Sequence, residues 1–107
     1  MPLKIELAEE NAVMTAYLDG EIDHHSARAM REEIDAEAMR VKPKTLILNF
    51  ENVTFMDSSG IGLIMGRYRL INYWDARLKV SGVSPGSYKV MRLAGLDKLA
   101  GISKKEA

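Results

Sequence analysis

The stretch TLILNFENVTFMDSSGIGLIMGRYRLI, residues 45–71, has the pattern of a strand, a loop and a helix. Residues 45–50 form a short apolar run, which favours a strand covered on both faces of a sheet. A helix is expected to begin at Asp57–Ser59, because the side chain of Asp57 or Ser58 can accept a hydrogen bond from a free amide of the first turn. Sites in α/β sheets gather in loops at the carboxyl ends of strands. The stretch therefore predicts an α/β fold with a candidate site at this loop.

The helix after this loop has two apolar stripes separated by a strip of small and polar residues. The stripe expected to face the sheet consists of Ile61, Ile64, Tyr68 and Ile71. The second stripe consists of Leu63, Leu70 and Trp74, and the strip between them holds Gly62, Gly66, Arg69 and Tyr73. A glycine inside a helix costs roughly 1 kcal/mol relative to alanine. Gly62 and Gly66 therefore predict a close approach to this backbone, by another helix of the same domain or by a partner protein.

Three more strands and two more helices are expected along the chain. Strands are predicted at residues 3–7, 11–22 and 77–83 from alternating or β-rich patterns. A helix with apolar residues at helical spacing is predicted to start near Asp23 or Ser26, either of which can cap it, and to stop at Pro43. The last helix is predicted to have Ser84 as its N-cap, Pro85 at its first position and Gly95 as its stop.

The resulting order is β-β-α-β-α-β-α. Two strand–helix–strand units imply right-handed crossovers, and the first hairpin adds one antiparallel strand. We therefore expect one α/β domain over residues 1–107, with a roughly four-stranded, mostly parallel (mixed) sheet packed with helices. The segment after Leu96 is expected to be a short charged tail.

The composition excludes several functional classes. The 107 residues include no cysteine, so disulfides, thiol catalysis and cysteine-based zinc sites are excluded. Lys and Arg balance Asp and Glu at 15 each, which argues against nucleic acid or an anionic membrane as the main partner. No apolar run approaches the ~18–20 residues of a membrane span, and the first residues have no signal-peptide core. A cytoplasmic protein is therefore expected.

Ser58 and Ser59 have several chemical interpretations, of which the simplest is that they only cap a helix. A nucleophilic serine on a strand–turn–helix elbow needs G-x-S-x-G and a downstream histidine. Here Met56 lies two residues before Ser58 and both histidines lie upstream, which argues against a hydrolase. Neither phosphate-loop glycine motif is present, so the glycines alone are a weak signal for nucleotide binding.

Phosphorylation is the remaining interpretation of Ser58. A phosphate adds about 1.5–2 negative charges, and the amino end of a helix accommodates negative charge. The fold would therefore tolerate the modification, whereas an acidic or closely packed partner surface would be repelled. Such a group can act as a switch of binding.

The segment DGEIDHHSA, residues 19–27, is a second candidate region. His24 and His25 are adjacent at a helix start and diverge by about 100°, so no metal site is expected from them. Glu21 and Asp23 are interpreted as part of a solvated acidic rim near a binding site, with Asp23 also suited to capping.

Together, LDGEIDHHSA (residues 18–27) and LILNFENVTFMDSSGIGLIMGRY (46–68) resemble the anti-sigma factor antagonists of the STAS domain family, in particular the sporulation branch. The D-S-S-G-[IL]-G core followed by G-R-Y is the most specific part. The segment VSGVSPGSYKVMRLAGLDKL (80–99) is similar to the family's final strand and helix. The resemblance covers Leu3 to Leu99, but the tail beyond Leu99 is shorter than in most members, which puts the final helix in question.

The resemblance implies a regulatory protein that is not an enzyme and needs no cofactor or metal of its own. Such proteins bind an anti-sigma factor that is also a serine kinase, which supplies ATP and Mg²⁺, and so release a sigma factor. Phosphorylation of the first serine of D-S-S-G, here Ser58, inactivates them, and a serine phosphatase reverses it. The partner surface implied by the resemblance and the helix pattern comprises Glu21, Asp23, His24, Asp57, Ser59, Gly60, Gly62 and Gly66. Two alternatives remain open: a small nucleotide-binding STAS-like domain, and a scaffold subunit of a stress-signalling complex.

Overall fold

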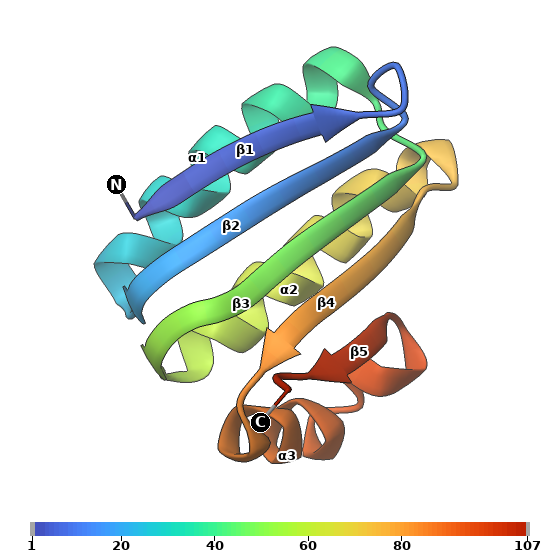
Figure 1. Ribbon diagram of the computed structural model, residues 1–107. Coiled ribbons are helices and arrows are strands. Elements are labelled where there is room, and N and C mark those ends of the chain that lie inside the picture. The colour runs from blue at the N-terminus through green and yellow to red at the C-terminus, as the bar shows by residue number, and fades with distance from the viewer. Residues whose placement is uncertain (1, 107) are drawn as a thin grey trace.

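The computed structural model describes residues 2–106 and shows a five-stranded mixed sheet with helices packed on it (Figure 1). The elements in chain order are β1 (Leu3–Ala8), β2 (Val13–Ile22), α1 (His24–Val41), β3 (Thr45–Met56), α2 (Ser58–Ile71), β4 (Arg77–Val83), α3 (Pro85–Leu93) and β5 (Gly101–Lys104), with single 3₁₀ turns at Asn72–Trp74 and Leu96–Lys98. The strand order is β1-β2-β3-β4-β5, with β1 antiparallel to β2 and the remaining pairs parallel. The predicted fold class is confirmed.

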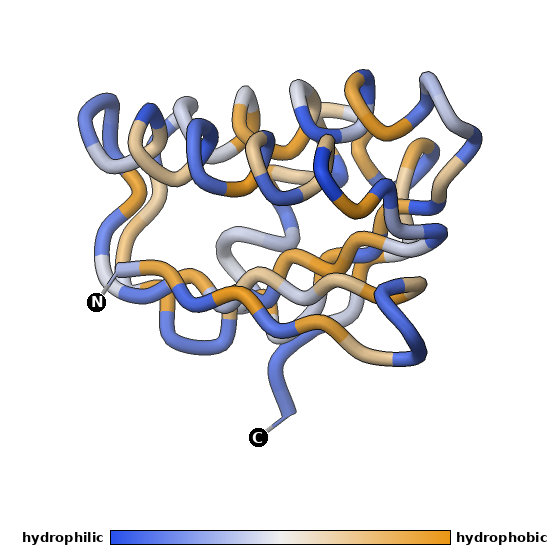
Figure 2. Tube along the Cα trace, turned by 90° about the horizontal axis from the view of Figure 1, so that it is seen from above, coloured by the Kyte–Doolittle hydropathy of each residue, from blue (hydrophilic) through white to orange (hydrophobic). Residues whose placement is uncertain are grey.

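The long helices α1 and α2 lie on one face of the sheet only. Both run behind the strands in Figure 1, and the view from above in Figure 2 separates a coiled layer from an extended one. On β3, Leu46, Leu48 and Phe50 are buried, while Ile47 and Asn49 are half-buried. The expectation that residues 45–50 are covered on both faces is therefore wrong. The apolar run misled because Ile47 gains its partial burial from neighbouring strands rather than from a second helical layer.

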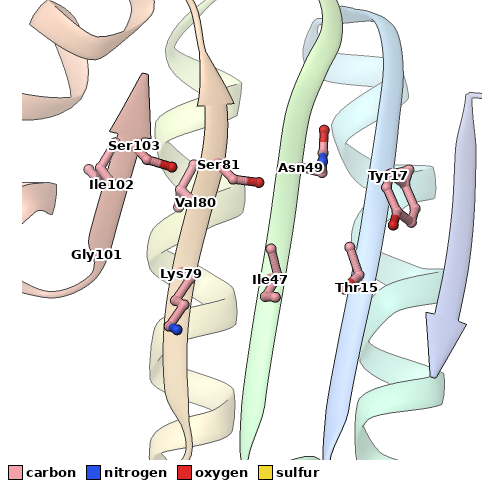
Figure 3. A pocket seen from close by; sticks show the side chains of 10 residues that line it. All are labelled: Thr15, Tyr17, Ile47, Asn49, Lys79, Val80, Ser81, Gly101, Ile102 and Ser103. Carbon is pink, nitrogen blue, oxygen red and sulfur yellow. The ribbon is translucent and has the colours of Figure 1, made fainter. Parts of the chain in front are cut away.

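The uncovered face carries mostly polar side chains of β2 to β5, shown in Figure 3. A shallow depression of about 490 Å³ lies there. It is lined by Thr15, Tyr17, Ile47, Asn49, Lys79, Val80, Ser81, Gly101, Ile102 and Ser103. This depression is on the opposite face of the sheet from α1 and α2.

The core lies between the sheet and the two long helices. Met30, Ile34 and Ala38 of α1 recur at helical spacing and are fully buried. The residues that α2 buries are Gly60, Leu63, Ile64, Arg67 and Ile71. The predicted sheet-facing stripe is therefore only half right, because Ile61 and Tyr68 are half-buried. The helix is rotated so that Leu63 and Arg67 also turn inward, toward α1.

The segment after Leu96 is a strand rather than a tail. A 3₁₀ turn at Leu96–Lys98 leads into β5, whose Gly101 and Ile102 pair with Lys79 and Val80 of β4. The amide of Lys105 then donates to the carbonyl of Val83 at 2.7 Å. The sheet thus has five strands where roughly four were expected. The sequence of β5 has no strand periodicity from which it could be predicted. It is held in the sheet by its pairing with β4.

The final helix, which the resemblance left in question, is present as α3. Ser84 is its N-cap, with its hydroxyl accepting from the amide of Ser87 at 3.2 Å, and Pro85 occupies the first position. Gly95 follows the helix with a positive φ of 82°, which suits glycine at a helix end.

Candidate functional site

The two candidate loops meet at one edge of the sheet. Beyond its pairing with β4, β3 continues beside β2, where Glu21 is opposite Phe55 and Ile22 is opposite Met56. The amide of Asp57 donates to the carbonyl of Ile22 at 3.2 Å. Because β2 and β3 are parallel, the chain leaves both strands at the same end. The segments GEID and MDSSG are therefore adjacent in space.

Asp57 is the N-cap of α2. Its backbone is extended, and its Oδ1 accepts from the amide of Ser59 at 2.8 Å. Ser58 is then the first helical residue and is exposed, while Ser59 is half-buried. Capping does not account for Ser58, because Asp57 performs it. The Ser58 hydroxyl is accessible at the positive end of the helix.

Asp23 caps α1 in the same way, at the end of the neighbouring strand β2. Its Oδ1 accepts from the amides of His25 at 3.0 Å and Ser26 at 2.9 Å, and the Ser26 hydroxyl accepts from the Asp23 amide at 2.9 Å. Hydrogen bonds, first of all from the Ser26 amide, lower the pKa of Asp23. The carboxylate thus stays ionised. Glu21 and His24 beside it are exposed, which agrees with an acidic rim around the loop.

Phe55 is an exposed aromatic residue at this edge that was not predicted from the sequence as part of the site. Its relative exposure is 53%, and it lies opposite Glu21 and three residues before Ser58. Exposed aromatic side chains surrounded by polar groups are frequent anchors of protein interfaces. Its place after a predicted strand, among polar neighbours, was the available signal.

The glycines of α2 differ in their surroundings. Gly60 is buried, and a Cβ there would overlap the side chain of Met56. A Cβ at Gly62 or Gly66 would meet nothing within 4 Å. Gly60 therefore has a packing role inside the fold, and its contact with a partner stays a prediction. Packing against a helix of the same domain does not explain Gly62 and Gly66.

A groove of about 540 Å³ separates the outer parts of α1 and α2 and begins beside Ser59. It is lined by His24, Ala27, Arg28, Arg31, Ser59, Gly62, Leu63, Gly66 and Arg67. Four of the predicted partner-binding residues therefore share one surface: His24, Ser59, Gly62 and Gly66.

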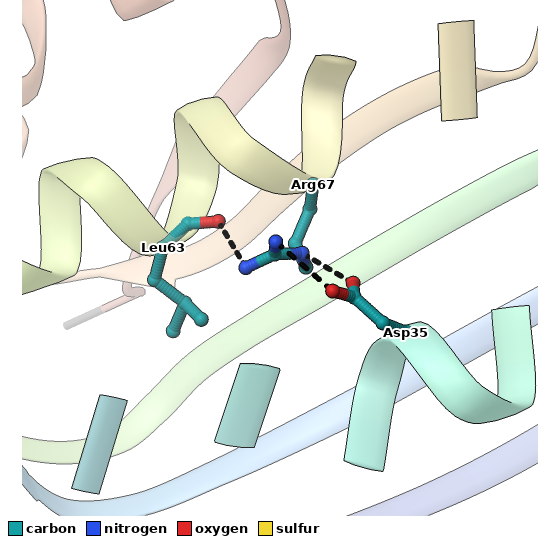
Figure 4. Close-up of polar contacts among 3 residues, drawn as sticks. All are labelled: Asp35, Leu63 and Arg67. Carbon is teal, nitrogen blue, oxygen red and sulfur yellow. Dashed lines mark hydrogen bonds and ion pairs between the residues drawn. The ribbon is translucent and has the colours of Figure 1, made fainter. Parts of the chain in front are cut away.

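Arg67 joins α2 to α1 along this groove (Figure 4). Its Nε lies 2.6 Å from Oδ1 of Asp35, its Nη2 donates to Oδ2 of Asp35 at 3.2 Å, and its Nη1 donates to the carbonyl of Leu63 at 3.2 Å. Burial raises the pKa of Asp35 and lowers that of Arg67, and the attraction between the two groups opposes both shifts. This pair was not predicted from the sequence, although an arginine one turn after Leu63 visibly interrupts an apolar stripe.

Two further findings concern what residues 2–106 do not contain. No group of three or more His, Cys, Asp or Glu side chains in this part of the chain could hold a metal ion. No helix within it is long and apolar enough to cross a bilayer.

Comparison with known proteins gives a consistent match. The family model described as STAS domain matches residues 4–107. The chain is 36% identical over 106 residues to the anti-sigma F factor antagonist of Paenibacillus polymyxa, covering 99% of this chain and 91% of that protein. It is 35% identical over 96 residues to the anti-sigma F factor antagonist of Lysinibacillus sphaericus, covering 90% of this chain and 81% of that protein.

Two solved structures of SpoIIAA are similar to this chain. The anti-sigma factor antagonist SpoIIAA in its unphosphorylated form has a TM-score of 0.76 and 28% identity, covering 98% of this chain and 89% of that one. The Bacillus cell fate determinant SpoIIAA in the phosphorylated form has a TM-score of 0.75 and 31% identity, covering 96% of this chain and 92% of that one. SpoIIAA thus has this fold both with and without the phosphate.

Proposed function

Since this chain belongs to the STAS domain family, we propose that it is an anti-sigma factor antagonist, switched off by phosphorylation of Ser58. In its unmodified form the protein binds an anti-sigma factor and so frees a sigma factor for transcription. The anti-sigma factor is also the serine kinase and supplies ATP and Mg²⁺, and a serine phosphatase restores the active form. Because that partner works with ATP, the proposal places the pair in the cytoplasm.

One observation carries the proposal: Ser58 is exposed as the first residue of α2, while Asp57 performs the capping. A kinase can reach the hydroxyl without unfolding the helix. A phosphate there faces the positive end of α2, which offsets part of its charge within the fold. The fold common to the two SpoIIAA forms supports this tolerance.

The loss of binding follows from local charge. Glu21, Asp23 and Asp57 already surround the loop, so an added phosphate deepens a negative region that a partner has to match. A partner surface shaped for an uncharged hydroxyl would bury an unpaired charge, which costs about 2–5 kcal/mol at an interface. The family is regulatory and binds proteins, and in this proposal the phosphoryl-transfer chemistry belongs to the partner.

Substitutions of Ser58 test the switch, with Ser59→Ala as the matched control. Ser58→Ala is expected to bind the purified anti-sigma factor kinase and to take up no phosphate, as measured by intact mass after incubation with ATP. Ser58→Asp is expected to keep its thermal transition and to bind at least tenfold more weakly. Ser59→Ala, which alters the neighbouring hydroxyl, is expected to be phosphorylated normally. Full phosphate uptake by Ser58→Ala would assign the switch to another residue.

A further inference from the structure

Gly62 and Gly66 are not required by the fold. Neither has a positive φ, and an added Cβ at either position would meet open space. Glycine inside a helix is nevertheless less favourable than alanine, because it loses more backbone freedom on folding. The space that these two residues leave is the floor of the groove between α1 and α2.

The groove is cationic although the chain as a whole is neutral. Arg28, Arg31 and Arg67 line it, and no carboxylate among the described residues does. Glu32 pairs with Arg28 at 3.4 Å, but both side chains are mostly exposed, so this pair is weak. Arg31 also lowers the pKa of Arg67, as a neighbouring like charge does. Asp35 pairs with Arg67 just outside the groove lining, so Arg31 is the arginine of the groove for which no ion pair is found in residues 2–106.

Arg67 retains hydrogen-bonding capacity in the groove. A guanidinium has five N–H groups. Hydrogen bonds to Leu63 and Asp35 use one N–H each on Nη1 and Nη2, while Nε lies 2.6 Å from Oδ1 of Asp35 in an ion pair but has no hydrogen-bond partner. The side chain is only 5% exposed, and no other protein acceptor within residues 2–106 is found for it. The second N–H on each of Nη1 and Nη2 therefore has no protein acceptor, in a residue that lines the groove.

We propose that this groove receives an acidic segment of the same protein partner, whose carboxylates meet Arg31 and Arg67 while its backbone or short side chains approach Gly62 and Gly66. This inference rests on the proposed function, since the partner is the anti-sigma factor. The proposed docking surface, formed by the serine loop and the groove, then has a negatively charged end and a positively charged end. Its loop end, at Glu21 and Asp23, is acidic and accepts a basic part of the partner, whereas its groove end is basic. Opposite charges at the two ends of one surface determine a single orientation of the partner.

The steric part of the proposal is tested with Gly62→Ala and Gly66→Ala. A control of matched chemistry is Gly86→Ala in α3, where a Cβ also meets open space but lies outside the groove. All three variants are expected to melt at or above the temperature of the parent chain. The two groove variants are expected to bind the purified anti-sigma factor at least tenfold more weakly, and Gly86→Ala as the parent does. Unchanged affinity in both groove variants overturns the proposal.

The electrostatic part is tested with Arg31→Glu, because Arg31 is exposed and no side-chain ion pair is found for it in residues 2–106. Arg92→Glu on α3 reverses the same charge away from the groove. Arg31→Glu is expected to weaken partner binding at least tenfold and to reduce its dependence on salt, whereas Arg92→Glu is expected to change neither. Equal effects of the two reversals would mean that only the overall charge matters, which overturns the proposal.

Failure of this inference and failure of the proposed function give different results. If the parent chain binds the partner and Ser58→Asp does not, the proposed function stands whatever the groove variants do. Inorganic phosphate is the probe for a rival occupant. Parent-like binding by Arg31→Glu, together with phosphate-induced shifts of the Gly62 and Gly66 amide resonances, would identify a small-anion site and overturn the protein-docking proposal. If the parent chain itself fails to bind the anti-sigma factor, both are wrong.

Discussion

Glycines occur both at closely packed positions of the domain and along the open groove, and the reasons differ. Gly60 and Gly82 lie where a neighbouring residue, Met56 or Glu51, already occupies the space of a Cβ. Gly62 and Gly66 lie on the groove side of α2, where that space is empty. Folding explains the first two glycines and gives no reason for the last two. The comparison shows that packing within the domain accounts for one pair of glycines only, which is why the docking proposal rests on the other pair.

The largest expected effect is that of Gly82→Ala, in the packed region. Gly82 has a φ of 68°, and its Cβ would lie 2.9 Å from the backbone nitrogen of Glu51. Left-handed strain and overpacking against backbone together are expected to cost about 2–4 kcal/mol of unfolding free energy. Urea denaturation provides the measurement. Gly101→Ala in β5, where a Cβ meets open space, is the control and is expected to leave stability nearly unchanged.

An intermediate effect is expected for Gly60→Ala. The new methyl group displaces the Met56 side chain, which is flexible enough to move, so the expected cost is about 1–2 kcal/mol. In a Met56→Ala background the overlap is removed, and the same substitution is then expected to be neutral or stabilising. A double-mutant cycle by urea denaturation measures the difference. Equal costs in the two backgrounds would contradict the assignment of Gly60 to packing.

The smallest effect, of opposite sign, is expected for Gly62→Ala and Gly66→Ala. Each is expected to raise the unfolding free energy by about 0.5–1 kcal/mol, because alanine restricts the unfolded chain and meets no neighbour in the fold. Thermal melting monitored by circular dichroism detects this gain. A loss of stability in either variant would remove the distinction between the two regions.

Short-range interactions explain why the candidate loops could be located from the sequence. Asp57 caps α2 through an amide two residues away, and Asp23 caps α1 through amides two and three residues away. Strand and helix periodicity depend on neighbours at similarly short separations. The exposed position of Ser58 and the meeting of GEID with MDSSG follow from these caps and from the parallel order of the strands.

Long-range interactions explain what could not be located. Arg67 contacts Asp35, 32 positions earlier in the chain, and this pair turns Leu63 and Arg67 inward where Ile61 and Tyr68 were expected. The groove depends on the same rotation of α2 against α1. Phe55 lies in the part of β3 that extends past β4, and only the polar residues around it in the sequence pointed to its exposure.

The sequence by itself determined the α/β class, the order of the elements through the last helix and the place of the serine loop, and it reduced the N-caps of α1 and α2 to two candidates each, because these features depend on residues within one or two turns of each other. Only the tertiary structure decided that one face of the sheet stays uncovered, that residues 101–104 form a fifth strand and that three arginines line a groove over two open glycines. Those features depend on the pairing of distant segments. In each case a segment far away in the same chain supplies the hydrogen bonds and the buried area, and no pattern within one segment encodes that pairing.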